Sequence, residues 1–389
     1  MILPGIAGGA PVPARQVWQV GQVSRHRTRP SPLLAPGTWC GVSSSRRRLA
    51  GFVGGLLVGW VSLLPDHAFA AEVEALSNSE QIALLERWKN RHGNDAGTAP
   101  PSAAVDAKID GPGDYTFSLE LGGLTRMYRV HVPAKYSPSK PTPMLLSFHG
   151  GGGNMDYQAD DKFYGLISKS DQVGYIAVFP NGYSPFKSGK LATWNAGNCC
   201  AGARDKNIDD VGFVRELIKR LKSQLNIDPD RIYANGMSNG ALFSYRLACE
   251  MADTIKAIAS VAGSDGTKAC TPSRPVSILE IHAKDDEMML FNGGAGRDSK
   301  MLADFVSVPE TIARWVRRNS CSPVPRRVLE TPGAYCDAYT QCRGNVEVKL
   351  CVTESGGHSW PGGVKVRTGA PGSTAISATD LMWDFFDRR

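Results

Sequence analysis

The segment that most constrains this chain is Gly-Met-Ser-Asn-Gly at residues 236–240, with Ser238 at its centre. An apolar, strand-like run at 231–234 precedes it, and a helical pattern at 241–251 follows it. Strand, sharp turn and helix in this order are the setting in which a G-x-S-x-G motif presents a nucleophilic serine. Side chains at the two flanking glycines would clash in so tight a turn, and a helix N-terminus lies behind the serine. Because the bare motif occurs by chance in many proteins, the interpretation depends on finding partners for Ser238.

A candidate acid follows the apolar, strand-like run at 276–281. Two aspartates, Asp285 and Asp286, compete for this role. We favour Asp286, because the acid usually stands four residues after a histidine, and His282 occupies that position. The alternative is that both carboxylates only cap the loop.

A candidate base, His358, lies in a Gly-rich loop after the last predicted strand. Glycines allow such a loop to bend back over the serine. The chain order Ser238, Asp286, His358 is typical of α/β-hydrolases and differs from the two common protease orders. His358 is expected to accept the serine proton and return it to the leaving group, while Asp286 holds the imidazole tautomer. The alternative for a lone histidine is a structural role.

An oxyanion hole is predicted from His-Gly-Gly-Gly-Gly-Asn at 149–154, which follows the apolar run at 143–148. Glycines let backbone N–H groups approach a substrate oxygen closely, and the N–H groups of Gly151 and Asn239 are the candidate donors. A flexible linker and a phosphate-binding loop are the alternatives. The segment lacks the G-K-[ST] ending of a phosphate-binding loop, which disfavours that alternative.

Two tryptophans are candidates for lining a substrate cleft. Trp194 lies in Trp-Asn-Ala-Gly-Asn-Cys-Cys at 194–200, and Trp360 lies two residues after His358. Buried packing is the alternative for each.

The rest of the chain from 106 to 389 alternates apolar strand-like runs with amphipathic helical patterns. This alternation predicts an α/β domain with a mostly parallel sheet and helices on both faces. The predicted strands are 115–121, 125–132, 143–148, 175–179, 231–234, 255–261, 276–281 and 346–352. The predicted helices are 210–225, 241–251, 308–319 and 378–386. We find no internal repeat and no second globular unit.

The first 105 residues predict a leader and a tether. Of the formal net charge of +7, residues 1–70 contribute +6, from seven arginines and one aspartate, so no basic stripe for nucleic acid remains. Arginines at 46–48, an apolar run at 49–64 and Ala-Phe-Ala at 68–70 predict a signal peptide and a secreted or periplasmic protein. The alternative, a membrane anchor, needs an apolar run of about 20 residues. Residues 71–105 predict a short helix and a linker.

Eight cysteines remain if the leader, with Cys40, is removed, and an even number in an exported chain indicates disulfides. The guessed pairs are Cys249–Cys270 and Cys321–Cys342, with Cys336–Cys351 as a third candidate. A zinc site is disfavoured because no C-x-x-C pair with matching histidines is present.

Taken together, these segments resemble the exported polyhydroxybutyrate depolymerase-like esterases, a group that overlaps with feruloyl and acetylxylan esterases. The motifs that carry the resemblance are 149–154, 194–200, 236–241, the acid loop, Ser-Val-Pro-Glu-Thr at 307–311 and Gly-Gly-His-Ser-Trp-Pro-Gly-Gly at 356–363. The resemblance implies an α/β-hydrolase fold, no cofactor or metal, and ester hydrolysis through an acyl-enzyme.

The acid loop departs from the family pattern, with Ala283-Lys284 and Glu287 in place of the usual small residues and a frequent proline. The absence of an added surface-binding domain favours soluble oligomers or small esters over crystalline polymer. Two other functions stay open from the sequence: an α/β-hydrolase-fold peptidase and a non-catalytic exported binding module.

Overall fold

The structure is a computed structural model that describes residues 108–297, 299, 303–365 and 371–389. The leader predicted at 1–70 and the helix and linker predicted at 71–105 lie outside the described residues. The domain predicted at 106–389 is described from residue 108 onward.

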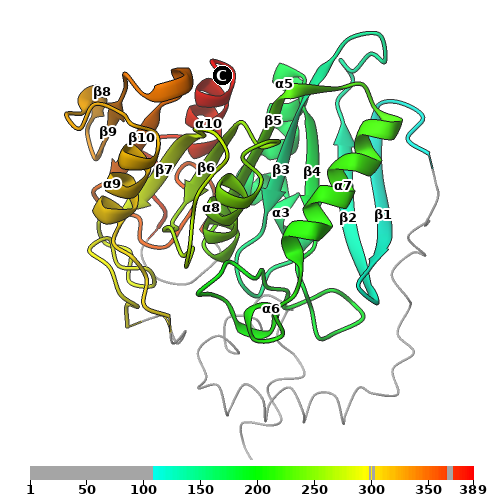
Figure 1. The fold of residues 1–389 in the computed structure, drawn as a ribbon, viewed down its shortest axis with the longest axis horizontal. Coiled ribbons are helices and arrows are strands. Elements are labelled where there is room, and N and C mark those ends of the chain that lie inside the picture. The colour runs from blue at the N-terminus through cyan, green and yellow to red at the C-terminus, as the bar shows by residue number, and fades with distance from the viewer. Residues whose placement is uncertain (1–107, 298, 300–302, 366–370) are drawn as a thin grey trace, which may run out of the picture. The chain divides into compact units, whose positions relative to one another are not determined.

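One 10-stranded sheet runs through the described part, in the order β1-β2-β4-β3-β5-β6-β7-β10-β9-β8 (Figure 1). The strands are β1 (Gly113–Leu121), β2 (Leu124–Val132), β3 (Thr142–Phe148), β4 (Ile176–Pro180), β5 (Ile227–Met237), β6 (Ala257–Val261), β7 (Ser277–Ala283), β8 (Arg326–Thr331), β9 (Ala334–Tyr339) and β10 (Val348–Thr353). From β4 to β10 all neighbouring strands are parallel, and antiparallel hairpins extend the sheet at both edges. The strands β5, β6, β7 and β10 therefore end side by side at one sheet edge.

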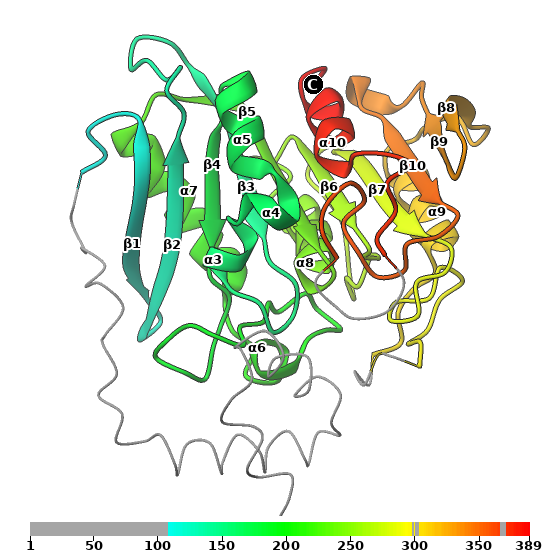
Figure 2. The same ribbon diagram turned by 180° about the vertical axis from the view of Figure 1, so that it is seen from behind.

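Helices cover both faces of this sheet. They are α3 (Met155–Gln158), α4 (Asp161–Tyr164), α5 (Leu166–Val173), α6 (Ala201–Asp205), α7 (Asp210–Gln224), α8 (Asn239–Glu250), α9 (Val308–Arg318), the 3₁₀ turn η2 (Arg343–Asn345) and α10 (Ala378–Phe386). Figure 1 shows α7, α8 and α9 in front of the sheet, and Figure 2 shows α4, α5 and α10 in front of the opposite face. The expected α/β-hydrolase fold, with a mostly parallel sheet between two helical layers, is confirmed.

The central strands are apolar because both of their faces are covered. Every residue of β3, β4, β6 and β7 is buried, as expected for strands of a doubly covered parallel sheet. The sequence missed the β8–β9 hairpin. Most residues of the edge strand β8 are exposed, so this strand carries charged side chains in place of an apolar run.

The described residues form four disulfides. They are Cys199–Cys200, Cys249–Cys270, Cys321–Cys342 and Cys336–Cys351. The last three are the pairs guessed from the sequence, whereas the pairing of the adjacent cysteines was not foreseen. Cys336 and Cys351 face each other in the register of β9 and β10, so that bond joins neighbouring strands of the sheet.

Neither a membrane-spanning helix nor a metal cluster was found in the described part. Its helices are too short or too polar to cross a bilayer, and no three of its His, Cys, Asp or Glu side chains group as metal ligands would.

Candidate active site

Ser238 occupies a sharp turn between β5 and α8. Its backbone adopts φ 56° and ψ −121°, a conformation that non-glycine residues rarely adopt. A Cβ on Gly236 would lie 2.3 Å from the carbonyl carbon of Gly240, and one on Gly240 would lie 2.1 Å from the Phe148 carbonyl oxygen. Both distances are far inside van der Waals contact, so the turn requires glycine at both positions. The Ser238 N–H donates to the Val261 carbonyl at 3.0 Å, which fixes the turn against the end of β6.

Asp286 lies beyond β7 and contacts the predicted base. Its Oδ2 accepts from His358 Nδ1 at 2.8 Å, and its Oδ1 accepts from the N–H groups of Met288 and Met289 at 2.8 and 2.9 Å. The carboxylate is buried. Burial alone would raise the pKa of Asp286, but the neighbouring His358 and His282 rings outweigh it and hold that pKa well below its usual range. The carboxylate therefore stays ionised behind His358.

Asp285, the competing aspartate, has a different set of partners. Its two oxygens accept from the N–H groups of Gly357 and Gly356 at 2.8 and 3.3 Å. Asp285 thus holds the backbone of the Gly-rich loop, and Asp286 contacts the ring that this loop carries. The sequence could not separate the two aspartates, because they are adjacent and both lie past the end of β7.

The His358 ring is buried, and its Nε2 has no hydrogen-bond partner among the described residues. Its loop packs back toward the serine turn through Tyr164. The Tyr164 ring lies 5.2 Å from that of Trp360, and its hydroxyl lies 3.9 Å from Sδ of Met237, which immediately precedes Ser238. Within the described structure Ser238 and His358 are not hydrogen-bonded; catalytic hydrogen bonds often tighten only when substrate binds.

The glycine turn after β3 leaves two N–H groups, those of Gly150 and Gly151, without a protein acceptor among the described residues. Gly152 donates to Ala192 at 2.9 Å and Gly153 donates to Gly150 at 3.0 Å, whereas Gly151 N–H has no protein acceptor among the described residues. The absence of an internal partner is what a donor to a substrate oxygen requires.

Asn239, the second candidate donor, is the first residue of α8. Its N–H also has no protein acceptor in the described part of the chain. Its side chain is fully engaged, with Oδ1 accepting from Trp194 N–H at 2.7 Å and Nδ2 donating to the Trp194 carbonyl at 3.0 Å. A Cβ on Gly150 would lie 3.5 Å from the Ser238 Cβ, so the glycine turn adjoins the serine.

His149 supports the glycine turn from below, a role that the sequence did not assign to it. Its Nδ1–H donates to the Gly150 carbonyl at 2.8 Å, and its Nε2 accepts from Gly182 N–H at 3.0 Å. One ring nitrogen thus acts as a donor and the other as an acceptor, which is the pattern of a neutral imidazole. Burial lowers the pKa of His149 to about 4, in agreement with this pattern.

Sequence comparison finds esterases among the proteins similar to this chain. The chain is 32% identical to feruloyl esterase B of Piromyces equi over 239 residues, which are 59% of this chain and 42% of that protein. It is 26% identical to a probable feruloyl esterase C of Aspergillus niger over 67% of this chain and 83% of that one. The chain is thus similar in sequence to feruloyl esterases. The chain spans less than half the length of the Piromyces equi protein.

No protein-family model matches the chain. Among solved structures, an acetyl xylan esterase from Aspergillus awamori covers 68% of this chain and 94% of its own length, with 12% identity and a TM-score of 0.46. The resemblance expected from the motifs is confirmed for the feruloyl esterases, and its polyhydroxybutyrate part stays a prediction.

Both tryptophans singled out from the sequence are buried, and a role for either in lining a substrate cleft stays a prediction. Trp194 is fully buried; its Nε1–H donates to the His149 carbonyl at 3.1 Å, and its ring stacks on Phe243 at 5.1 Å. Trp360 is 3% exposed and donates to Thr379 Oγ1 at 3.0 Å. Both rings pack against buried aromatic neighbours, Trp194 against Phe243 and Trp360 against Tyr164. Trp360 also borders a pocket of about 260 Å³ beside α4, α5 and α10.

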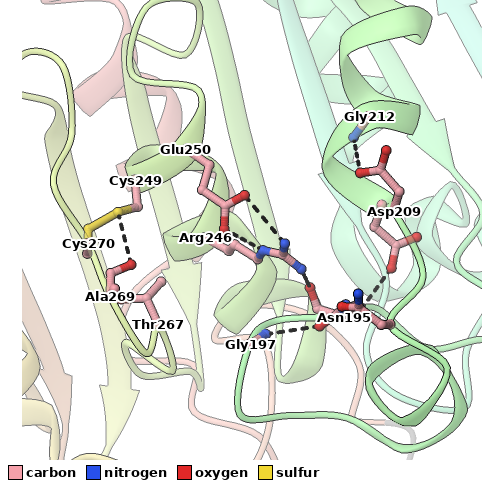
Figure 3. A network of polar contacts seen from close by, with 12 residues as sticks. Asn195, Gly197, Asp209, Gly212, Arg246, Cys249, Glu250, Thr267, Ala269 and Cys270 are labelled. Carbon is pink, nitrogen blue, oxygen red and sulfur yellow. Dashed lines mark hydrogen bonds and ion pairs between the residues drawn. A yellow bond between two sulfur atoms is a disulfide. The ribbon is translucent and has the colours of Figure 1, made fainter.

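The segment that follows Trp194 is held by charged side chains, of which Asp210 and Arg126 are buried. Asn195 N–H donates to Asp210 at 2.8 Å, and the Asn195 carbonyl accepts from Arg246 at 2.7 Å (Figure 3). Arg246 in turn pairs with Glu250 at 2.7 Å, and the buried Asp210 pairs with Arg126 at 2.6 Å. These contacts fix the backbone next to Trp194, which hydrogen-bonds to the Asn239 side chain. They therefore help to position Asn239, whose N–H is a predicted oxyanion-hole donor.

Proposed function

We propose that the protein hydrolyses carboxylic esters through an acyl-enzyme on Ser238, with His358 as base and Asp286 as its partner. The observation that carries this proposal is the hydrogen bond of 2.8 Å from His358 Nδ1 to Asp286, which leaves a buried, unpaired Nε2 at the sheet edge where the serine turn lies. The similarity to feruloyl esterases supports the same activity.

The chemistry follows from which nitrogen carries the proton. Since Nδ1–H donates to Asp286, Nε2 holds the lone pair that accepts the Ser238 proton as Oγ attacks the ester carbonyl. The N–H groups of Gly151 and Asn239 stabilise the oxyanion that forms. His358 then protonates the leaving alcohol, and a water molecule, activated by the same Nε2, releases the acid and restores the serine.

For the substrate, we propose esters of hydroxycinnamic or acetyl groups on plant polysaccharides, or hydroxyalkanoate oligomers. The first class comes from the names of the relatives and the last from the motif resemblance. The test is hydrolysis of methyl ferulate, acetylated xylan, p-nitrophenyl acetate and hydroxybutyrate oligomers by the wild type and by Ser238→Ala.

We expect the wild type to hydrolyse at least one of these esters and Ser238→Ala to lose that activity while keeping its circular dichroism spectrum. A folded wild type that cleaves none of them, or a variant that retains the activity, would contradict the proposal. Cleavage in a parallel peptide screen, without ester hydrolysis, would support the peptidase alternative.

We further propose that the protein is exported, to the periplasm or the medium, after cleavage before Ala71. Four disulfides are typical of proteins that leave the reducing cytoplasm. N-terminal sequencing of the protein recovered outside the cytoplasm should begin at Ala71; a mature chain that keeps residues 1–70 would exclude it.

A further inference from the structure

A second histidine lies behind Asp286, in addition to His358. His282 is on β7 and is 2% exposed. Its Nδ1 lies 3.1 Å from Glu280 Oε1, and its Nε2 lies 2.9 Å from the Met289 carbonyl oxygen and 3.4 Å from Asp286 Oδ2. Asp286 Oδ2 therefore has one imidazole on each side, His358 at 2.8 Å and His282 at 3.4 Å.

Both nitrogens of His282 face hydrogen-bond acceptors only. A neutral imidazole has one donor and one acceptor, so these contacts require an additional proton on the ring or on Glu280. The other oxygen of Glu280, Oε2, accepts from the Tyr245 hydroxyl at 2.8 Å, and the edge of Phe291 completes the surroundings of the ring. The protonated ring with an ionised Glu280 satisfies all of these contacts.

The carboxylates around His282 favour the protonated ring, whereas burial raises the pKa of Glu280. Burial alone would lower the pKa of His282, but hydrogen bonds to Asp286 and Glu280 outweigh it and raise the pKa to about 10. The ionisable groups that face the ring are Glu280 on the same strand and Asp286 in the following loop; Tyr245 of α8 and His358 reach it through these two carboxylates.

We propose that His282 is a positioning residue for the ester hydrolysis proposed above: a buried imidazolium, neutralised by Glu280, that keeps the Asp286 carboxylate ionised and limits the negative charge facing His358. With His282 protonated, the group of Glu280, His282 and Asp286 carries a net charge of −1. Without that proton it carries −2, and the extra negative charge favours protonated His358, which cannot act as a base.

The orientation of Asp286 does not depend on His282 alone, because the Met288 and Met289 N–H groups already hold Oδ1. The inference therefore concerns charge, and charge can be restored by a second substitution. His282→Gln leaves the group at −2, whereas Glu280→Gln/His282→Gln returns it to −1 with side chains that still hydrogen-bond.

The activity experiment compares the pH dependence of kcat/KM for these variants. For His282→Gln we expect the acid limb to move up by about one pH unit, so that kcat/KM falls by roughly threefold at pH 7 and by up to about tenfold at lower pH. The double variant should return the acid limb toward its wild-type position. A purely structural role for His282 predicts additive damage and an unmoved acid limb, and either result would overturn the inference.

His131→Gln is the matched control. His131 on β2 also lies between two carboxylates, at 3.1 Å from Asp114 and 3.2 Å from Asp171, but it has no contact with the site. Its replacement should leave the acid limb unchanged.

A second readout does not need activity. In ¹⁵N-histidine-labelled protein, His282, assigned through the His282→Gln variant, should show both ring nitrogens protonated at every pH from 5 to 9. A neutral His282 ring at pH 7 would overturn the inference even if the enzyme is active. Conversely, a wild type without esterase activity but with a protonated His282 would reject the proposed function and leave the charge assignment intact.

Discussion

The two sides of the Ser238 turn each contain a buried histidine outside the predicted triad, and the surroundings favour a neutral ring on one side and a protonated ring on the other. On the side of β3, His149 has one donor and one acceptor as partners, and burial lowers its pKa to about 4. On the side of β7, His282 has acceptors only, and its carboxylate partners raise its pKa to about 10 despite burial. Both rings are almost completely buried, so partner atoms and not depth determine the charge.

The difference matches the chemistry expected on each side. The β3 side must present neutral backbone N–H groups to a developing oxyanion, and a neutral His149 braces that turn. The β7 side is expected to stabilise an imidazolium on His358. The negative charge that does so comes from Asp286, and a protonated His282 offsets the additional negative charge of Glu280.

The largest effect should come from the aspartates of the β7 side. Asp286→Asn should lower kcat by about 10⁴, because the amide favours the wrong His358 tautomer. Asp285→Asn should lower it by roughly tenfold or less, because it weakens only the contacts to the loop backbone. Steady-state kinetics on one ester measures both; equal losses would mean that the aspartates share one role.

On the β3 side, His149→Ala should lower kcat by about 10² with little change in KM, because a displaced Gly151 N–H is lost chiefly from the transition state. His149→Gln keeps a donor and an acceptor and should recover part of the loss. A rise in KM at constant kcat would show that His149 acts on substrate binding and not on the oxyanion hole.

Two glycines near Ser238 differ in the space around them, and this difference should appear in stability. Gly240→Ala places a Cβ 2.1 Å from the Phe148 carbonyl oxygen and should cost about 3 kcal/mol or more of stability. Gly150→Ala meets only ordinary contacts at 3.5 and 3.6 Å and should change stability by less than about 1 kcal/mol. Denaturant unfolding of the two variants measures this difference, and similar losses would contradict the steric account.

The pH dependence of stability should have opposite signs on the two sides. With a folded-state pKa near 4, His149 contributes stability that is complete above its unfolded value of about 6.5 and is lost as pH falls toward 4. With a pKa near 10, His282 contributes stability that is complete below about 6.5 and is lost as pH rises through 10.

Melting temperatures from pH 4 to pH 10 therefore test the comparison. The difference in melting temperature between the wild type and His149→Gln should become smaller at acidic pH. The difference between the wild type and His282→Gln should become smaller at alkaline pH. The same trend for both variants would mean that the two rings do not differ in charge.

Much of the fold could be predicted from the sequence, because the buried parallel strands are mostly apolar. The β8–β9 hairpin could not be predicted, since an exposed edge strand leaves no such pattern. Likewise, the glycines around Ser238 identify the turn because they are a steric requirement that is visible locally.

The contacts on the β7 side could not be predicted from the sequence. The separate partners of Asp285 and Asp286 depend on how a loop 72 residues downstream folds back. Two of the partners of His282 are carboxylates, and one of them, Glu280, lies in the middle of a buried strand. The burial of Trp194 and Trp360 was equally hidden, because an aromatic residue in a motif looks the same whether it packs or binds.

The central claim is that Ser238 is an activated nucleophile, and a fluorophosphonate probe tests it most directly. Peptide mass spectrometry of the labelled wild type should find a single adduct on Ser238, and His358→Ala should show almost none in the same time. An adduct on another residue, or a folded wild type that takes no label, would contradict the account.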